Sequence, residues 1–153
     1  MNYIKLSQIA TYSQGKQVDI SERFAKNNGS LKRFLRIVDY TNNNEPIRYV
    51  KDYGSQYFVD DDDVVMIRYG SQSAGMVVRG KSGIIANNMF KINFKKEINR
   101  KFMYYYLSQP KIYNLLRSGQ SSSTMPAITF SIMNDIFVPD VDANFQQHIV
   151  NTM

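Results

Sequence analysis

The sequence predicts an α+β fold that is rich in strands, and three features of the chain support this. Short apolar or β-branched segments bounded by turn residues fill the first two thirds, which is typical of strands. Two segments with helical spacing follow, and then two short strands and the start of a helix. At 153 residues the chain has the length of one domain. We therefore expect a β-rich globular unit over residues 1–142 and a separate helix beginning at 143–153.

The strands predicted in the first part are Tyr3–Leu6, Arg33–Asp39, Gln56–Val59 and Asp63–Arg68. The last of these alternates poorly but is apolar and β-branched, which suits a strand that is buried on both faces. We expect Met76–Arg79 and Gly83–Phe94 to pair with each other. Gly80 and Gly83 flank the short connection between them, as in a hairpin.

The helix pair is predicted over Asn99–Ser108 and from Pro110 onward, with Gly119 as a stop residue. Proline suits the first turn of a helix, where its missing N–H has no intrahelical partner in any case. The apolar residues at helical spacing in the first helix are Phe102, Met103, Tyr106 and Leu107. In the second helix we expect Ile112, Leu115 and Leu116 on one face. We expect the aromatic run Phe102, Tyr104, Tyr105 and Tyr106 to serve packing rather than base stacking.

Short strands are predicted after the helix pair at Ile128–Ile132 and Asp135–Val138, with Pro139 ending the second. Asp142 is the expected N-cap of a last helix that starts at Ala143. The apolar face of that helix is predicted to hold Phe145, Ile149, Val150 and Met153.

The charge balance favours a polyanionic partner. The formal net charge is +6, with 19 Lys and Arg against 13 Asp and Glu, and eleven tyrosines and many Asn, Gln and Ser residues are interleaved with the cations. Such side chains contact the phosphates and base edges of nucleic acids. No apolar run approaches 18 residues, and the start Met1–Lys5 lacks the apolar stretch of a signal peptide. We expect a cytoplasmic location and no membrane association.

Several kinds of catalytic and metal site are excluded by composition and motif. Cysteine is absent and His148 is the sole histidine, which excludes disulfides, thiolate catalysis and zinc bound by several Cys or His. The sequence lacks the Asn/Asp-Pro-Pro-aromatic motif of adenine methyltransferases, the Glu-x-Lys that should follow Pro139-Asp140 in a metal-dependent nuclease, and a phosphate-binding glycine loop. Asp60–Asp63 lacks the spaced oxygens of a cation loop and is expected to be a solvated turn. We therefore predict a non-catalytic chain without a cofactor of its own.

Three segments are candidates for contacting DNA. The first contains a flexible polar loop in which small residues permit close approach to a groove and Gln72 can pair with an adenine edge. The alternatives are an ordinary hairpin loop for the first segment, a half-exposed strand face for the second and a linker for the third. The candidate residues are Arg68, Tyr69, Ser71, Gln72, Ser73, Arg79 and Lys81 in the first segment, Lys32, Arg33, Arg36 and Tyr40 in the second, and Gln120, Ser121, Ser122, Ser123 and Thr124 in the third.

Five blocks occur in a distinctive order along the chain. They are Ile4–Ala10 with Gly15, Phe34–Asp39, Asp63–Gly70, Gly119–Ile128, and Ile136–Pro139 followed by Gln146–Val150. In these blocks the chain resembles the target-recognition domain in the specificity subunit of type I restriction–modification enzymes. The resemblance extends over almost the whole chain.

This resemblance implies recognition of one half of a bipartite double-stranded DNA target. Full specificity subunits of this family carry two such domains joined by two long antiparallel helices that dock the modification subunits, whereas this chain has one domain and the first turns of one helix. The implied partners are DNA, modification and restriction subunits, and a second recognition domain, with S-adenosylmethionine and ATP used on the other subunits. Two rival hypotheses are a decoy of the same fold that binds modification subunits without reading DNA, and a standalone enzyme.

Overall fold

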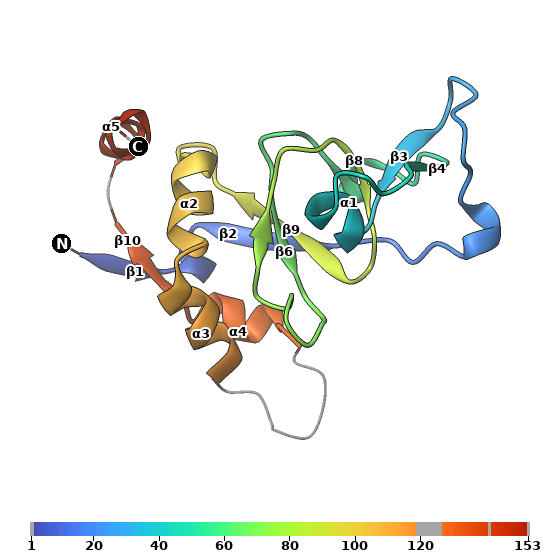
Figure 1. Ribbon diagram of the computed structural model, residues 1–153. Coiled ribbons are helices and arrows are strands. Elements are labelled where there is room, and N and C mark those ends of the chain that lie inside the picture. Colours follow the sequence, from blue (N-terminus) through green and yellow to red (C-terminus); the bar gives the residue numbers. More distant parts are fainter. Residues whose placement is uncertain (1, 119–126, 141, 153) are drawn as a thin grey trace.

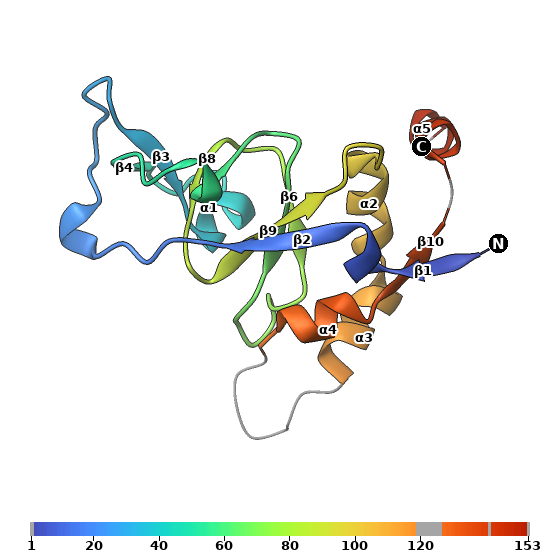
Figure 2. The same ribbon diagram turned by 180° about the vertical axis from the view of Figure 1, so that it is seen from behind.

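Two four-stranded sheets and one two-stranded sheet form in the computed structural model, which describes residues 2–118, 127–140 and 142–152. The first sheet is antiparallel, in the order β2 (Ala10–Gln14), β9 (Met89–Phe94), β6 (Val64–Ile67), β7 (Val77–Val78). The second has the order β4 (Arg48–Val50), β3 (Lys32–Leu35), β8 (Gly83–Ile85), β5 (Phe58–Val59), and β3 and β8 are parallel. β1 (Tyr3–Lys5) pairs with β10 (Phe137–Pro139). The first sheet lies between the other two (Figures 1 and 2).

Helices pack beside these sheets, and the structure confirms a mixed α+β fold. Three single turns of 3₁₀ helix also occur in the described residues, η1 (Leu6–Gln8), η2 (Ile20–Glu22) and η3 (Ser55–Tyr57). No helix among the described residues is both long and apolar enough to cross a bilayer. The α-helices of this part of the chain are α1 (Ile37–Thr41), α2 (Arg100–Leu107), α3 (Pro110–Ser118), α4 (Phe130–Asn134) and α5 (Ala143–Asn151).

Strand β6 connects two hydrophobic cores. All four of its residues are fully buried, and successive side chains of a strand point to opposite faces. Val64 and Met66 accordingly join the first core, while Val65 and Ile67 join the second. This explains why the strand is apolar without alternation, and it confirms the prediction of a strand buried on both faces.

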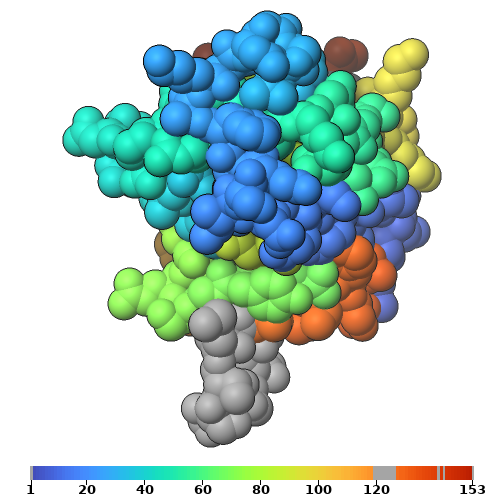
Figure 3. Space-filling model, turned by 90° about the vertical axis from the view of Figure 1, so that its right-hand side faces the viewer, coloured from blue at the N-terminus to red at the C-terminus, as the bar shows by residue number. Residues whose placement is uncertain are grey.

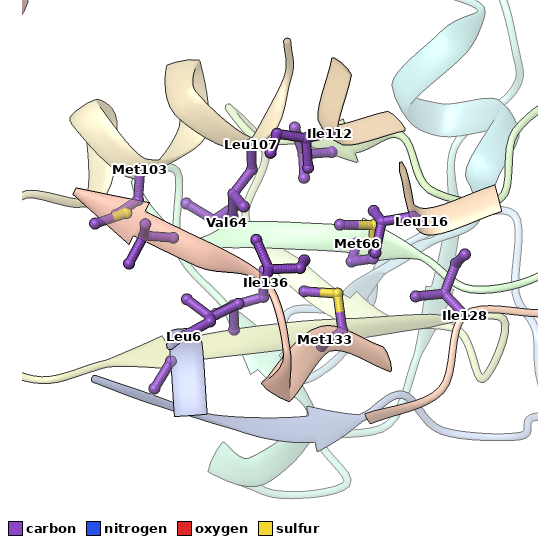
Figure 4. Packing of buried hydrophobic residues seen from close by; sticks show 14 of the residues in the cluster. Leu6, Val64, Met66, Met103, Leu107, Ile112, Leu116, Ile128, Met133 and Ile136 are labelled. Carbon is purple, nitrogen blue, oxygen red and sulfur yellow. The ribbon is translucent and has the colours of Figure 1, made fainter. Parts of the chain in front are cut away.

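The first core lies between the first sheet and helices α2, α3 and α4. Figure 4 shows its side chains converging from these elements and from η1 and β10. The Asn99 side chain caps α2 by accepting from the Phe102 N–H at 2.9 Å, which confirms the predicted start of this helix. In α3, Ile112 and Leu116 are buried, but Leu115 is 55% exposed. The prediction that Leu115 shares their face was therefore wrong.

Two predicted strands are helical in part. The predicted strand Arg33–Asp39 ends at Leu35, as part of β3. It ends there because the Asp39 carboxylate accepts from the Arg36 N–H at 2.8 Å and so starts α1. Ile128–Ile132 is not a strand, since the Thr129 hydroxyl accepts from the Ile132 N–H at 3.1 Å and caps α4. In both segments a side-chain cap outweighs the β preference of Ile, Val and Phe.

The predicted pairing of Met76–Arg79 with Gly83–Phe94 was also wrong. β7 pairs with β6 instead, while β8 crosses to the second sheet and pairs with β3 and β5. A Cβ atom on Gly83 would lie 2.4 Å from the Arg33 carbonyl oxygen, so glycine permits this close approach of β8 to β3. Gln56–Val59 is likewise a strand only in its second half, after η3.

Helix α5 docks on the N-terminus of α2 through an amide rather than through a purely apolar face. Asp142 caps it as predicted, accepting from the Phe145 N–H at 2.8 Å. Gln146 is 1% exposed, and its side-chain oxygen accepts from the Asn99 N–H at 2.8 Å. Ile149 and Val150 pack on the first core as expected, but Phe145 is 44% exposed and lies outside the packed face.

Candidate nucleic-acid interface

Most of the first candidate segment lies in a loop at the end of the β6–β7 hairpin, here called the 68–76 loop. Its ends are held together because Ile67 N–H donates to Met76 O and Gly75 N–H donates to Ile67 O, each at 2.9 Å. Gly70 and Gly75 have φ values of 136° and 95°, a region that favours glycine. The residues between the two glycines therefore form a tight projecting turn.

Helix α3 holds the backbone of the 68–76 loop. The Arg117 guanidinium donates to Ala74 O at 2.8 Å and to Ser71 O, and the Tyr113 hydroxyl donates to Gln72 O at 2.7 Å. The side chains of Ser71 and Gln72 are exposed. Side chains of α3 thus bind the loop carbonyl groups, and the Ser71 and Gln72 side chains are exposed on a backbone that is held in place without a ligand. No local sequence pattern indicates either supporting residue, because both lie on a helix more than 40 positions further along the chain.

Arg68 is held at the base of the loop. Its Nη1 donates to the Gln14 side-chain oxygen at 2.6 Å, and its guanidinium carbon lies 5.0 Å from the centre of the Phe130 ring and 5.4 Å from that of Tyr69. Tyr69 itself is 37% exposed. Arg68 therefore links β2, α4 and the loop, and it places positive charge next to the exposed Tyr69 ring.

Arg79 and Lys81 lie at the opposite end of β7 from the 68–76 loop, so the structure does not bring all residues of the first segment together. Arg79 pairs with Asp62 at 3.0 Å and lies over the Tyr104 ring. Lys81 adjoins Ser82, whose hydroxyl donates to Asp61 at 2.7 Å. The acidic run is the predicted turn, since the Asp60 side chain accepts from the N–H groups of Asp62 and Asp63.

The second candidate segment turns its arginines toward a buried carboxylate. The Asp39 side chain is fully buried. Arg36 donates to it at 2.9 and 3.2 Å, and Arg33 lies 3.6 Å from it. Tyr40 packs on the second core, where burial raises the pKa of its hydroxyl. Lys32 differs from these residues because it is exposed, with its Nζ 5.7 Å from the centre of the Phe58 ring. It is the member of this segment best placed to reach a phosphate.

Some predicted residues cannot be placed. The third candidate segment, Gln120–Thr124, lies outside the described residues, as do Gly119 and Met153.

A further polar surface, which sequence reasoning missed, adjoins the 68–76 loop. A groove of about 310 Å³, here called the β2–η3 groove, is lined by Tyr12, Ser13, Gln14, Gln56 and Tyr57. In Figure 3 the segment that follows β2, in blue, lies across the same face of the molecule as the light-green 68–76 loop. The crowding of Lys51, Tyr53, Gln56 and Tyr57 within one short stretch of sequence was the available indication.

Comparison with known proteins gives a family and a fold. The sequence matches the family described as the type I restriction modification DNA specificity domain over residues 1–153. The HsdS subunit from Thermoanaerobacter tengcongensis aligns with a TM-score of 0.71 at 17% sequence identity, and the type I restriction–modification S subunit from M. genitalium aligns with a TM-score of 0.67 at 16%. No curated protein matches the sequence at a significant level.

Each of these two alignments covers 99% of this chain but only 36% and 37% of the respective subunit. The chain therefore spans about a third of the length of the specificity subunits that share its fold. Because the family match extends over every residue of the sequence, the chain belongs to the family of type I restriction–modification DNA specificity domains.

Proposed function

We propose that this chain recognises one half of a bipartite double-stranded DNA target within a type I restriction–modification enzyme. The observation that carries the proposal is the 68–76 loop, in which Ser71 and Gln72 project from a backbone bound by Arg117 and Tyr113. A glutamine amide can form two hydrogen bonds with an adenine edge in the major groove. A loop that is ordered in advance loses less conformational entropy when it does so.

Contacts to phosphate would fix the position of the loop on the duplex. Lys32 is the best-placed cation of the second segment because it is exposed, whereas Arg33 and Arg36 are bound to Asp39. The net charge of +6 adds a general attraction to polyanions. In this proposal the backbone contacts provide affinity and orientation, and the loop provides sequence discrimination.

The chain would contribute target choice, while modification and restriction subunits would contribute the chemistry in the cytoplasm. Residues 1–142 would be the recognition domain. Helix α5 would begin a long helix that connects to a second recognition domain and to those subunits. The family match favours this proposal over the rival decoy, because that family is described by DNA specificity.

The test combines DNA binding with methylation mapping. Binding of random-sequence duplex DNA to the chain, followed by fluorescence anisotropy, should weaken by decades between about 50 and 200 mM salt if six or more phosphates are contacted. Replacing Gln72 by Ala should relax the target at one base, a loss of about 1–3 kcal/mol of discrimination. Methylome sequencing of cells with the complete enzyme would reveal the change.

Ser7→Ala is the control, because it truncates an exposed polar side chain on η1, outside the three candidate segments. Binding to the duplex that does not respond to salt would refute the proposal. An unchanged methylation motif in a folded Gln72→Ala enzyme would remove the loop from it.

A further inference from the structure

The glutamine side chains of the described residues fall into two groups. Most have side-chain hydrogen bonds, as Gln14 has with Arg68 and Gln146 has with the Asn99 backbone. Gln56 and Gln72 are exposed and, within the described part of the chain, have no side-chain hydrogen bond. Gln72 lies on the 68–76 loop, and Gln56 lines the β2–η3 groove. Two amides are therefore available to a ligand on adjoining surfaces.

Gln14 joins these two surfaces. Its side-chain oxygen accepts from Arg68, at the base of the 68–76 loop, and its side-chain nitrogen donates to Asn87 O. Asn87 in turn donates to the side-chain oxygen of Gln17. Because Gln14 also lines the groove, its side chain connects the base of the loop to the groove.

Two lysines lie beside the groove over tyrosine rings. The Lys16 Nζ is 5.2 Å from the ring centre of Tyr53 and 5.7 Å from that of Tyr57, and the Lys51 Nζ is 5.1 Å from that of Tyr53. Neither lysine forms an ion pair with a carboxylate of the described residues. Ring faces hold the ammonium groups in place without neutralising their charge.

Carboxylates also lie near this end of the groove. The Tyr53 hydroxyl donates to Glu22 at 3.0 Å, and Asp19 acts on the same hydroxyl electrostatically. The hydrogen bond turns the Tyr53 hydroxyl toward Glu22. The groove between Gln14 and Gln56 is lined by hydroxyl, amide and aromatic groups and by no carboxylate, so its lining is compatible with a polyanion.

We infer that the β2–η3 groove is a second DNA contact surface, in which Lys16 and Lys51 bind phosphates and Gln56 reads a base edge beyond those within reach of Gln72. This inference rests on the proposed function and extends it from the loop to the groove. The Gln56 and Gln72 amides lie on different connections of the fold. Gln56 is in η3, which precedes β5 of the second sheet, and Gln72 is in the loop that follows β6 of the first sheet. They would contact different base pairs of the same half-target.

The first test measures salt dependence with random-sequence duplex DNA and the whole chain. The double variant Lys16→Gln/Lys51→Gln should lower the slope of log affinity against log salt by about two, since each lost phosphate contact lowers it by about one. The matched control is Lys101→Gln/Lys111→Gln, which likewise removes two lysine charges, here from two exposed side chains. The Lys111 Nζ lies 5.5 Å from the Tyr106 ring centre, in the same kind of lysine–tyrosine pair, but on helix α3 rather than beside the groove.

The outcomes separate this inference from the proposed function. If the unmodified chain binds with a steep salt dependence and the two double variants behave alike, the groove inference is overturned and the proposed function stands. If the unmodified chain shows no salt-dependent binding, the proposed function fails and the inference fails with it. A larger loss of slope in the Lys16/Lys51 variant supports both.

The second test concerns base reading by Gln56. In the complete enzyme, Gln56→Ala should relax the methylation motif at a position different from the one changed by Gln72→Ala. The expected loss of discrimination is roughly 5- to 140-fold at that base, from about 1–3 kcal/mol for a bidentate contact. An unchanged motif in a folded Gln56→Ala enzyme overturns base reading by this residue. Circular dichroism of each variant verifies the fold.

Discussion

The Lys32–Tyr40 segment and the 68–76 loop are both candidates for DNA contact in the sequence, yet arginines have opposite roles at the two in the structure. In the first, Arg33 and Arg36 turn inward to the fully buried Asp39 carboxylate. In the second, Arg117 from a distant helix binds backbone carbonyls and leaves the loop side chains exposed. In the first region the arginines stabilise the fold, whereas in the second an arginine supports a loop whose exposed side chains are uncharged and polar.

The difference follows from the acceptors that these arginines meet, a buried carboxylate in one region and loop carbonyl groups in the other. A buried carboxylate without a cation would be very unfavourable, so the Asp39 carboxylate is stabilised by ion pairs with Arg33 and Arg36. A set of loop carbonyls needs only donors, and a guanidinium provides several in one plane. A cluster of arginines in a sequence therefore predicts a DNA-contacting surface only when no buried acid lies close to it.

The largest effect that would test this comparison is expected for Asp39→Ala. The substitution removes the buried carboxylate that the Arg33 and Arg36 guanidinium groups share, leaving Arg36 only Glu45 as a carboxylate partner, at 3.6 Å, and it removes the acceptor that starts α1. Breaking a buried ion pair from one side costs about 3–5 kcal/mol. Urea unfolding followed by circular dichroism would measure it.

Glu97→Ala serves as the control for Asp39→Ala, since this exposed carboxylate has no ion pair among the described residues and should change stability by less than about 0.5 kcal/mol. A loss for Asp39→Ala as small as that of the control would show that Asp39 does not organise the segment.

A smaller and more local effect is expected for Arg117→Met. Methionine keeps much of the length of the side chain but loses the hydrogen bonds to Ala74 O and Ser71 O, and bonds to a charged group contribute about 1.5–3 kcal/mol. Amide hydrogen exchange should quicken at Gly75, whose N–H is bonded to Ile67 O. Lys111→Met on the same helix should leave that exchange rate unchanged. Equal protection of Gly75 in Arg117→Met and the unmodified chain would mean that α3 does not order the loop.

The parts of the fold that follow from local sequence were predictable. The Asn99 cap, the proline at the start of α3 and the Asp142 cap each act within one helical turn, and all three helix starts were predicted. The segments Arg33–Asp39 and Ile128–Ile132 were misassigned because their β-branched residues conceal the caps made by Asp39 and Thr129. In both segments the side chain that caps the helix and the N–H that it accepts from are three residues apart, which is the spacing typical of a helix N-cap.

The candidate site was less predictable because its support comes from residues distant in sequence. Arg117 reaches back to Ser71, Arg68 to Gln14, and η3 lies against β2. No periodic pattern links such positions. The sequence could suggest the exposed Gln72, but it could not show that Arg79 lies at the far end of the hairpin, paired with Asp62.

The smallest expected effect on stability distinguishes the one outward-facing cation of the Lys32–Tyr40 segment from its inward-facing neighbours. Lys32 is exposed over the Phe58 ring, so Lys32→Gln should alter stability by less than about 1 kcal/mol, the value of an exposed cation–π contact. It should nevertheless lower the salt slope of DNA binding by about one, evenly across sequences. Arg36→Gln should do the reverse, destabilising the fold by loss of its bonds to Asp39 and Pro46 O while leaving the slope unchanged. Anisotropy titrations at several salt concentrations, with urea unfolding of both variants, would measure the two quantities side by side. If folded Arg36→Gln lowers the slope as much as Lys32→Gln does, then Arg36 reaches DNA as well, and the inward and outward roles assigned to these cations are not distinct.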